Sequence, residues 1–137
     1  MQTIVIGYDE TESARRALDR AVQLAEAFDS KLIVTSVAPV EYYVTRSAGP
    51  IQPGEGNDEH RDQLATARER LGDTGIDVEF VPAVGQPADT IVEIAHDRGA
   101  DLIVVGTRDP GIVERLLGQS VSESVARHAD CDVLIVR

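Results

Sequence analysis

Apolar and polar positions along this chain follow two periodicities in turn. Five short apolar runs have the length of buried strands, and the segments that precede four of them repeat apolar residues every three or four positions, as amphipathic helices do. The predicted strands are residues 3–8, 31–37, 77–83, 101–106 and 132–136, and the predicted helices begin near 11–13, 59, 87 and 120. This alternation predicts right-handed crossovers and a parallel sheet with helices on both faces.

The first predicted helix has the clearest one-sided pattern. Thr11, Glu12 and Ser13 supply N-cap chemistry at its start. Its expected buried stripe is Ala14, Ala17, Leu18, Ala21, Leu24, Ala25 and Phe28. The second helix, residues 59–71, has a weaker pattern, and the third starts at Pro87, a residue suited to the first helical position.

Residues 39–57 contain several helix and strand breakers. Gly49-Pro50 and Pro53-Gly54-Glu55-Gly56 favour turns over regular structure. We therefore predict an irregular, mobile loop over this stretch.

Length and composition indicate one domain over residues 1–137. The 137 residues suffice for a core without disulfides or a structural metal, and 42% hydrophobic with only 4% aromatic residues predicts an aliphatic core. No apolar run approaches the roughly 20 residues of a membrane span, and the N-terminus lacks a signal-peptide pattern. We expect a cytoplasmic protein.

The net charge of -11 opposes binding to nucleic-acid backbones, which depends on Lys and Arg. Lys31 is the single lysine among 13 basic residues. An acidic, lysine-poor surface suggests a halophilic protein whose stability rises with KCl.

The last third of the chain carries the strongest functional signal. The strand that ends at Gly106 leads into a loop containing Gly111 and Gly118, and a helix signal follows from Ser120. Unpaired amides and the helix dipole can hold a phosphate at such a helix start. Ser120-Val-Ser-Glu123 also has the capping-box pattern, so a cap alone and a cap that touches phosphate both explain it.

These segments together resemble the universal stress protein family. The opening Ile4-Val-Ile-Gly-Tyr-Asp9 with Ser13, the glycine-bearing loop and the ending 127–137 all read like that family, so the resemblance covers essentially the whole chain. It implies an open, doubly wound, Rossmann-like sheet of the adenine nucleotide alpha hydrolase type, with strand order 3-2-1-4-5. Ligands of such sheets bind where the strand order reverses, between the first and fourth strands.

The resemblance also implies a nucleotide site. Residues that match Asp9 and Val37 meet adenosine in family members that bind ATP. Those that surround ribose and phosphates match Gly106, Arg108, Asp109, Gln119, Ser120, Val121 and Ser122, and Gly111 is a further candidate. The expected ligand is ATP or AMP, with Mg²⁺ or Mn²⁺.

The loop departs from the family motif Gly-x2-Gly-x9-Gly-Ser/Thr at two positions. Asp109 replaces the second glycine and Gln119 the third, and Pro110 removes an amide donor. A carboxylate beside a triphosphate predicts weakened ATP binding. Either of two effects would reverse this: neutralisation of Asp109 by Arg108, or a metal ion on Asp109 that bridges the phosphates.

The last strand predicts a partner. It is apolar and unbroken, and an unpaired sheet edge can pair with a twofold mate, as the resemblance also implies. The residues of this expected homodimer contact are Val133, Leu134, Ile135 and Val136. An unknown protein partner is expected besides.

Other reactive side chains carry weaker signals. His60, His96 and His128 lie on separate predicted helices, so we predict no metal site from them. Cys131 lies between Asp130 and Asp132, which would raise its thiol pKa, and we interpret it as a packing residue.

Three functions compete. The leading hypothesis is a non-catalytic module of the stress response that binds adenine nucleotide or a protein partner. The alternative is a slow ATP-hydrolysing enzyme of the same fold, although the chain lacks the Gly-x4-Gly-Lys-Ser/Thr phosphate loop. A phosphoacceptor receiver domain would need an Asp after the third strand and a Lys after the fifth, and residues 81–84 and Arg137 supply neither.

Overall fold

The computed structural model describes the backbone of residues 1–38, 55–107 and 121–137, and the side chains of the same ranges except 55–61. Strands β1 (Thr3–Gly7), β2 (Lys31–Ala38), β3 (Val78–Val84), β4 (Leu102–Gly106) and β5 (Asp132–Val136) form one sheet. Every pairing is parallel, in the order β3-β2-β1-β4-β5. The predicted fold class and strand order are confirmed.

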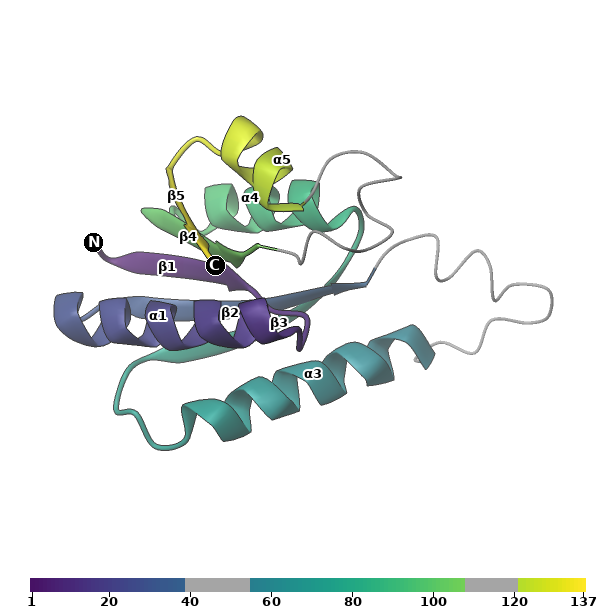
Figure 1. Ribbon diagram of the computed structural model, residues 1–137, viewed down its shortest axis with the longest axis horizontal. Helices are drawn as coiled ribbons and strands as arrows, with labels where there is room; N and C mark the ends of the chain where they lie inside the picture. Colours follow the sequence, from purple (N-terminus) through teal and green to yellow (C-terminus); the bar gives the residue numbers. More distant parts are fainter. Residues whose placement is uncertain (39–54, 108–120) are drawn as a thin grey trace.

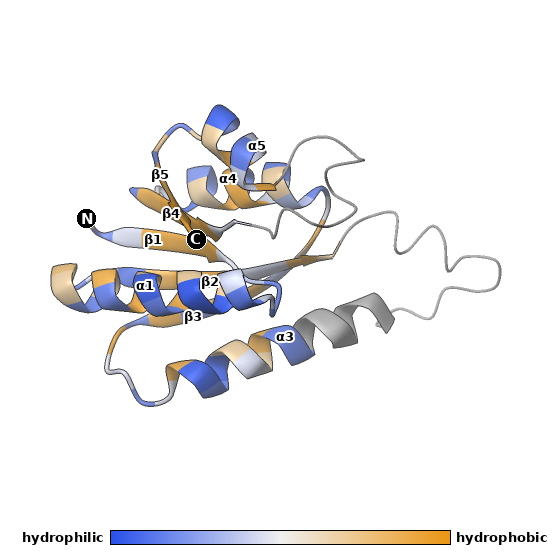
Figure 2. Cartoon of the chain, in the orientation of Figure 1, coloured by the Kyte–Doolittle hydropathy of each residue, from blue (hydrophilic) through white to orange (hydrophobic). Residues whose placement is uncertain are grey.

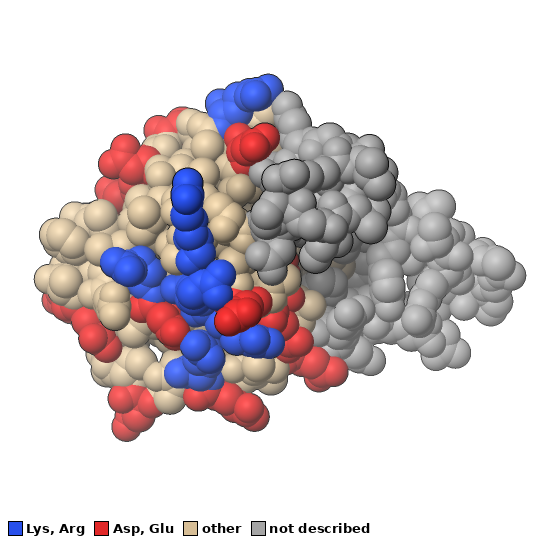
Figure 3. All heavy atoms as spheres, viewed as in Figure 1, with Lys and Arg blue, Asp and Glu red and all other residues tan. Residues whose placement is uncertain are grey.

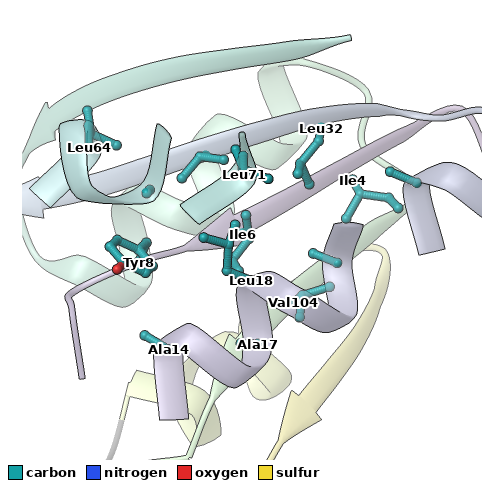
Figure 4. Packing of buried hydrophobic residues seen from close by; sticks show 14 of the residues in the cluster. Ile4, Ile6, Tyr8, Ala14, Ala17, Leu18, Leu32, Leu64, Leu71 and Val104 are labelled. Atoms are coloured by element: carbon teal, nitrogen blue, oxygen red, sulfur yellow. The ribbon is translucent and has the colours of Figure 1, made fainter. Parts of the chain in front are cut away.

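Helices cover both faces of this sheet (Figure 1). Helices α1 (Glu12–Phe28) and α3 (Glu55–Leu71) lie on one face, and α4 (Pro87–Asp97) and α5 (Val121–His128) lie on the other. Successive side chains of a strand point to opposite faces of the sheet. Ile4 and Ile6 pack with α1 and α3, whereas Val5 packs with α4 and α5. The middle segments of the central strands, residues 4–6, 32–34 and 102–105, are therefore apolar and buried (Figure 2), and Figure 4 shows the cluster on the α1 and α3 side.

The observed start of α1 follows the prediction closely. The Thr11 hydroxyl accepts a hydrogen bond from the Ala14 amide at 3.2 Å, and Asp29 ends the helix in the left-handed region at φ 52°. One member of the predicted stripe is wrong, because Phe28 is 54% exposed. The stripe continues for a turn beyond the sheet on which it packs, and Figure 1 shows this end of α1 reaching past the strands.

Helix α3 begins earlier than predicted. It starts at Glu55 rather than Glu59, so residues 55–57 are helical and the prediction of irregular structure is wrong there. Leu64, Ala67 and Leu71 anchor the helix on the sheet, and each further turn then costs little because propagation adds one hydrogen bond per residue. Residues 39–54, the rest of the predicted mobile loop, lie outside the described residues.

The remaining boundaries agree with the predictions to within two residues. Pro87 occupies the first turn of α4, as expected. Among the described residues, no helix is long and apolar enough to cross a membrane.

On the face that carries α1 and α3, basic side chains offset part of the negative charge of the surface. Basic side chains gather in the middle of this face with acidic side chains around them (Figure 3). Arg70 of α3 donates two hydrogen bonds to Asp19 of α1, at 2.9 and 2.7 Å, and Arg16 lies 3.4 Å from Glu12. Both pairs are exposed and contribute little to stability, and the Arg70–Asp19 pair is the one that joins α3 to α1.

Asp101 joins the start of β1 to the start of β4. One of its carboxylate oxygens accepts the backbone N–H groups of Gln2 at 2.7 Å and Thr3 at 2.9 Å. These bonds favour the charged form and lower the pKa of Asp101.

Acid should therefore weaken this contact. Because the folded pKa of Asp101 is lowered, its contribution is fully present above the unfolded value of about 4 and is lost as pH falls through the folded pKa. We expect Asp101→Asn to destabilise the protein at pH 7, and the difference from wild type to shrink toward pH 3. Urea unfolding at both pH values measures this, with the exposed Asp77→Asn as the control. An equal difference at both pH values would contradict the prediction.

Candidate functional site

A pocket opens at the carboxyl ends of β1, β2 and β4. Its volume of about 220 Å³ far exceeds the roughly 10–15 Å³ that one water needs. The described residues that line it are Gly7, Tyr8, Asp9, Thr11, Ser13, Ala14, Thr35, Val37, Gln63, Pro87, Ile91, Val105, Gly106 and Val121. The strand order reverses between β1 and β4, so the pocket lies where open α/β sheets bind their ligands.

Asp9 and Thr11 shape the side of the pocket next to α1. The Asp9 carboxylate accepts hydrogen bonds from the Thr11 hydroxyl at 2.7 Å and the Thr11 amide at 3.2 Å. Glu10 between them adopts a left-handed φ of 64°, which is strained for a residue with a side chain. Asp9 thus holds the turn that starts α1, and it also lines the pocket, where the positive end of the α1 dipole favours an anionic ligand.

Gly106 allows β4 to meet the start of α1. A methyl group at this position would lie 2.6 Å from both the carbonyl carbon and the carbonyl oxygen of Ser13, and 2.9 Å from the Ala14 nitrogen. These are backbone atoms, which cannot rotate away. Gly106 is therefore required for close packing, whatever it does for a ligand.

The opposite side of the pocket is mostly apolar. Val37, Pro87 and Ile91 line it from β2 and α4. The Thr35 hydroxyl donates to the Val81 carbonyl oxygen at 2.8 Å, so its proton is already used within the sheet. Such a wall suits a flat, largely apolar ring.

Tyr8 places a buried hydroxyl next to the pocket. The residue is 2% exposed, and its hydroxyl has no hydrogen-bond partner in the described part of the chain. Burial raises the pKa of Tyr8 and the nearby charge of Glu10 adds to the effect, whereas the guanidinium of Arg15 beside the hydroxyl opposes it. The hydroxyl therefore stays protonated at neutral pH.

The structure brings some of the predicted site residues together. Asp9, Val37, Gly106 and Val121 all line the pocket. Ser122 is buried in the first turn of α5 and is not among the described lining residues. Five predicted residues lie outside the described residues: Arg108, Asp109, Gly111, Gln119 and Ser120.

Sequence reasoning missed several lining residues. Gly7 and Thr35 could have been found, because both lie at the carboxyl ends of predicted strands. Ile91 belongs to the apolar stripe of α4, so periodicity alone marks it as a core residue and not as a residue of the pocket. Gln63 carries no sequence signal at all, since it sits among other polar residues of α3.

The other reactive side chains lie away from the pocket. His96 contacts Asp130 at 2.7 Å, and this hydrogen bond raises the pKa of His96. Burial raises the pKa of the Cys131 thiol, and Asp130 and Asp132 raise it further, in the predicted direction. Within the described ranges, no group of three His, Cys, Asp or Glu side chains could hold a metal ion. The side chain of His60 is outside the described set.

Comparisons with known proteins agree on one family. The model of the universal stress protein family matches residues 1–137. A universal stress protein of Mycobacterium tuberculosis is 40% identical, over 98% of this chain and 95% of that protein. A universal stress protein solved in complex with cAMP is 38% identical, with a TM-score of 0.78 over 99% of this chain and 96% of that one. One from Archaeoglobus fulgidus, solved with dAMP, shares the fold at 23% identity, with a TM-score of 0.76 over 100% of this chain and 98% of that one. The chain belongs to the universal stress protein family.

Proposed function

We propose that the pocket binds an adenine nucleotide and that the protein is a non-catalytic, cytoplasmic module of the stress response that acts through partners. The observation that carries this proposal is the pocket itself, at the point where the strand order reverses. The cAMP complex of a relative that is 38% identical supports the ligand class.

The residues of the pocket fit such a ligand. The apolar wall of Val37, Pro87 and Ile91 suits the adenine ring. The second oxygen of the Asp9 carboxylate is a further acceptor for ribose or base beside the one that Thr11 uses. The buried Tyr8 hydroxyl, which makes no hydrogen bond of good geometry within the described chain and lies near Arg15, is a second polar group at the pocket. Val121 starts α5, whose N-terminal amides and dipole favour the phosphate.

We further propose that AMP and cAMP bind better than ATP. Asp109 and Gln119 stand where the family motif has glycine, and the carboxylate of Asp109 opposes each added phosphate charge. A Mg²⁺ or Mn²⁺ ion that arrives with the nucleotide would screen this repulsion by binding the phosphates.

A binding role fits the pocket better than catalysis does. The described lining residues include no His, Lys or Cys. The Thr11 hydroxyl donates to Asp9 and lies 3.3 Å from the Ser13 hydroxyl, so these groups shape the turn that caps α1. The one carboxylate beside them, Asp9, also accepts the Thr11 amide and so belongs to the same turn, and no His or Lys of the described lining set lies next to either hydroxyl.

The test is to purify the protein, denature it, and identify any released nucleotide by mass spectrometry. Calorimetric titration of the stripped protein with AMP, cAMP and ATP, each with and without Mg²⁺, then gives the dissociation constants. Released adenine nucleotide, or binding in the micromolar range by at least one of the three, is the expected result. No binding at millimolar concentrations would overturn the proposal.

We also propose a homodimer through β5. The two edge strands of the sheet are β3 and β5. Strand β3 is the poorer candidate for pairing with a second copy, because it carries Pro82, which lacks an amide donor, and the charged Glu79. The residues Val133–Val136 of β5 include neither, and Ile135 is 37% exposed.

Ile135→Lys should therefore shift a dimer toward monomer, because two lysines would face each other across the twofold axis. Light scattering coupled to size-exclusion chromatography in molar KCl measures the mass. Val84→Lys is the matched control, since Val84 is 47% exposed on the other edge strand. A wild-type monomer at micromolar concentration, or an equal effect of both substitutions, would contradict this contact.

A further inference from the structure

Most polar side chains around the pocket already have hydrogen-bond partners within the protein. Thr11 binds Asp9, and Thr35 binds the Val81 carbonyl. Gln63 of α3 differs from these. It is half-buried, it lines the pocket, and its amide is only partly used.

The orientation of the Gln63 amide is set by β2. The Ser36 hydroxyl, on a residue that is 1% exposed, donates a hydrogen bond of 2.5 Å to the Gln63 side-chain oxygen. Because this oxygen faces Ser36, the two N–H donors of the same amide remain for a ligand, and the oxygen keeps a second lone pair. No partner of these N–H donors is found among the described residues.

Gln63 lies at the end of the pocket that would hold the base of a nucleotide. Helix α3 packs over β2, whereas Gly106 and Val121 belong to β4 and α5 on the other side of β1. A nucleotide whose phosphate lies at the start of α5 therefore has its base on the β2 side, next to Val37 and Gln63.

We propose that Gln63 is a specificity-determining residue that selects adenine over guanine, an inference that rests on the proposed nucleotide function. A side-chain amide can donate to a ring nitrogen of adenine and accept from its 6-amino group. Guanine presents two acceptors on the corresponding edge, O6 and N7, so the amide oxygen would face an acceptor. Ser36 holds the amide in place before the ligand arrives, which reduces the entropy lost on binding.

The experiment titrates AMP and GMP into stripped wild-type protein, Gln63→Met and Gln63→Glu. Methionine keeps the length of the side chain without an amide, and glutamate keeps an oxygen for Ser36 but loses the N–H donors. A bidentate amide contact discriminates by roughly five- to 150-fold. We expect wild type to favour AMP over GMP by a factor in this range, and Gln63→Met to bind AMP and GMP within about threefold of each other. Gln63→Glu should keep a preference for AMP, because its carboxylate still accepts from the 6-amino group and repels O6 of guanine, but it should bind AMP more weakly than wild type because the N–H donors are lost.

Thr66→Val is the control, because Thr66 is exposed on the same helix and its hydroxyl, within the part of the chain that the structure describes, bonds to the Asp62 carbonyl of the α3 backbone. It should keep the wild-type preference. Thermal melts of all variants show whether α3 remains folded. Tight AMP binding by wild type with an unchanged AMP preference in Gln63→Met overturns the role of Gln63 and leaves the proposed function intact. Failure of wild type to bind any adenine nucleotide overturns both.

Discussion

Replacing Gly106 with alanine should lower the free energy of unfolding by about 2–3 kcal/mol, at the upper end of the range for an overpacked site. The new methyl group would lie 2.6 Å from the carbonyl group of Ser13, whereas real Cβ contacts essentially never come under 3.0 Å. The start of α1 must then move away from β4. The turn held by Asp9 and Thr11 is part of the same segment, so we also expect weaker AMP binding.

Gly7→Ala is the matched control for this substitution. Gly7 ends the neighbouring strand β1, and a methyl group there would lie 2.7 Å from Cδ1 of Ile91, the far end of a flexible side chain. Ile91 can change rotamer at a cost of about 1 kcal/mol or less, so Gly7→Ala should destabilise less than Gly106→Ala. Urea unfolding gives both values from the shift in midpoint at constant slope. An equal loss of unfolding free energy in the two variants would contradict the prediction, because it would show that the α1 backbone moves as readily as the Ile91 side chain.

Replacing Asp109 with asparagine should strengthen ATP binding by at least tenfold in the absence of Mg²⁺. Two unit charges about 4 Å apart at an effective dielectric near 20 repel by roughly 4 kcal/mol, which corresponds to about a thousandfold in affinity. Screening by salt weakens such a repulsion, so tenfold is the lower bound of the expected effect. AMP carries less charge and should gain less than ATP.

Calorimetry in EDTA and in Mg²⁺ distinguishes two roles of Asp109: repulsion of the phosphates and binding of a metal ion that bridges them. Glu93→Gln removes one charge from the exposed side of α4 and controls for the change in net charge. A gain in ATP affinity that is equal for AMP, or shared by Glu93→Gln, would contradict local repulsion. A loss of ATP affinity confined to Mg²⁺ would show instead that the carboxylate holds the metal against the phosphates.

Local pattern predicted the elements of this fold well, and its failures occur where packing matters. The runs from Ile4 to Ile6 and from Leu102 to Val105 are buried on both faces, so their type follows from composition alone. Phe28 fits the stripe of α1 but is exposed, because a periodic pattern does not state where the underlying sheet ends. The predicted start of α3 was wrong for a related reason. Gly56 disfavours a helix locally, but residues 55–57 join a helix that Leu64, Ala67 and Leu71 hold on the sheet.

By itself the sequence determined the alternation of strands and helices, and with it a parallel sheet whose strand ends carry Asp9 and Gly106. The strand order came from the resemblance to a family, because periodicity does not say which strands are neighbours. Only the tertiary structure decided that Gln63 and Ile91 meet in one pocket, since this depends on how α3 and α4 lie on opposite faces of the sheet. It also decided that Gly106 is needed by the backbone of Ser13, a contact between residues that are far apart in the chain and close only when β4 lies beside β1.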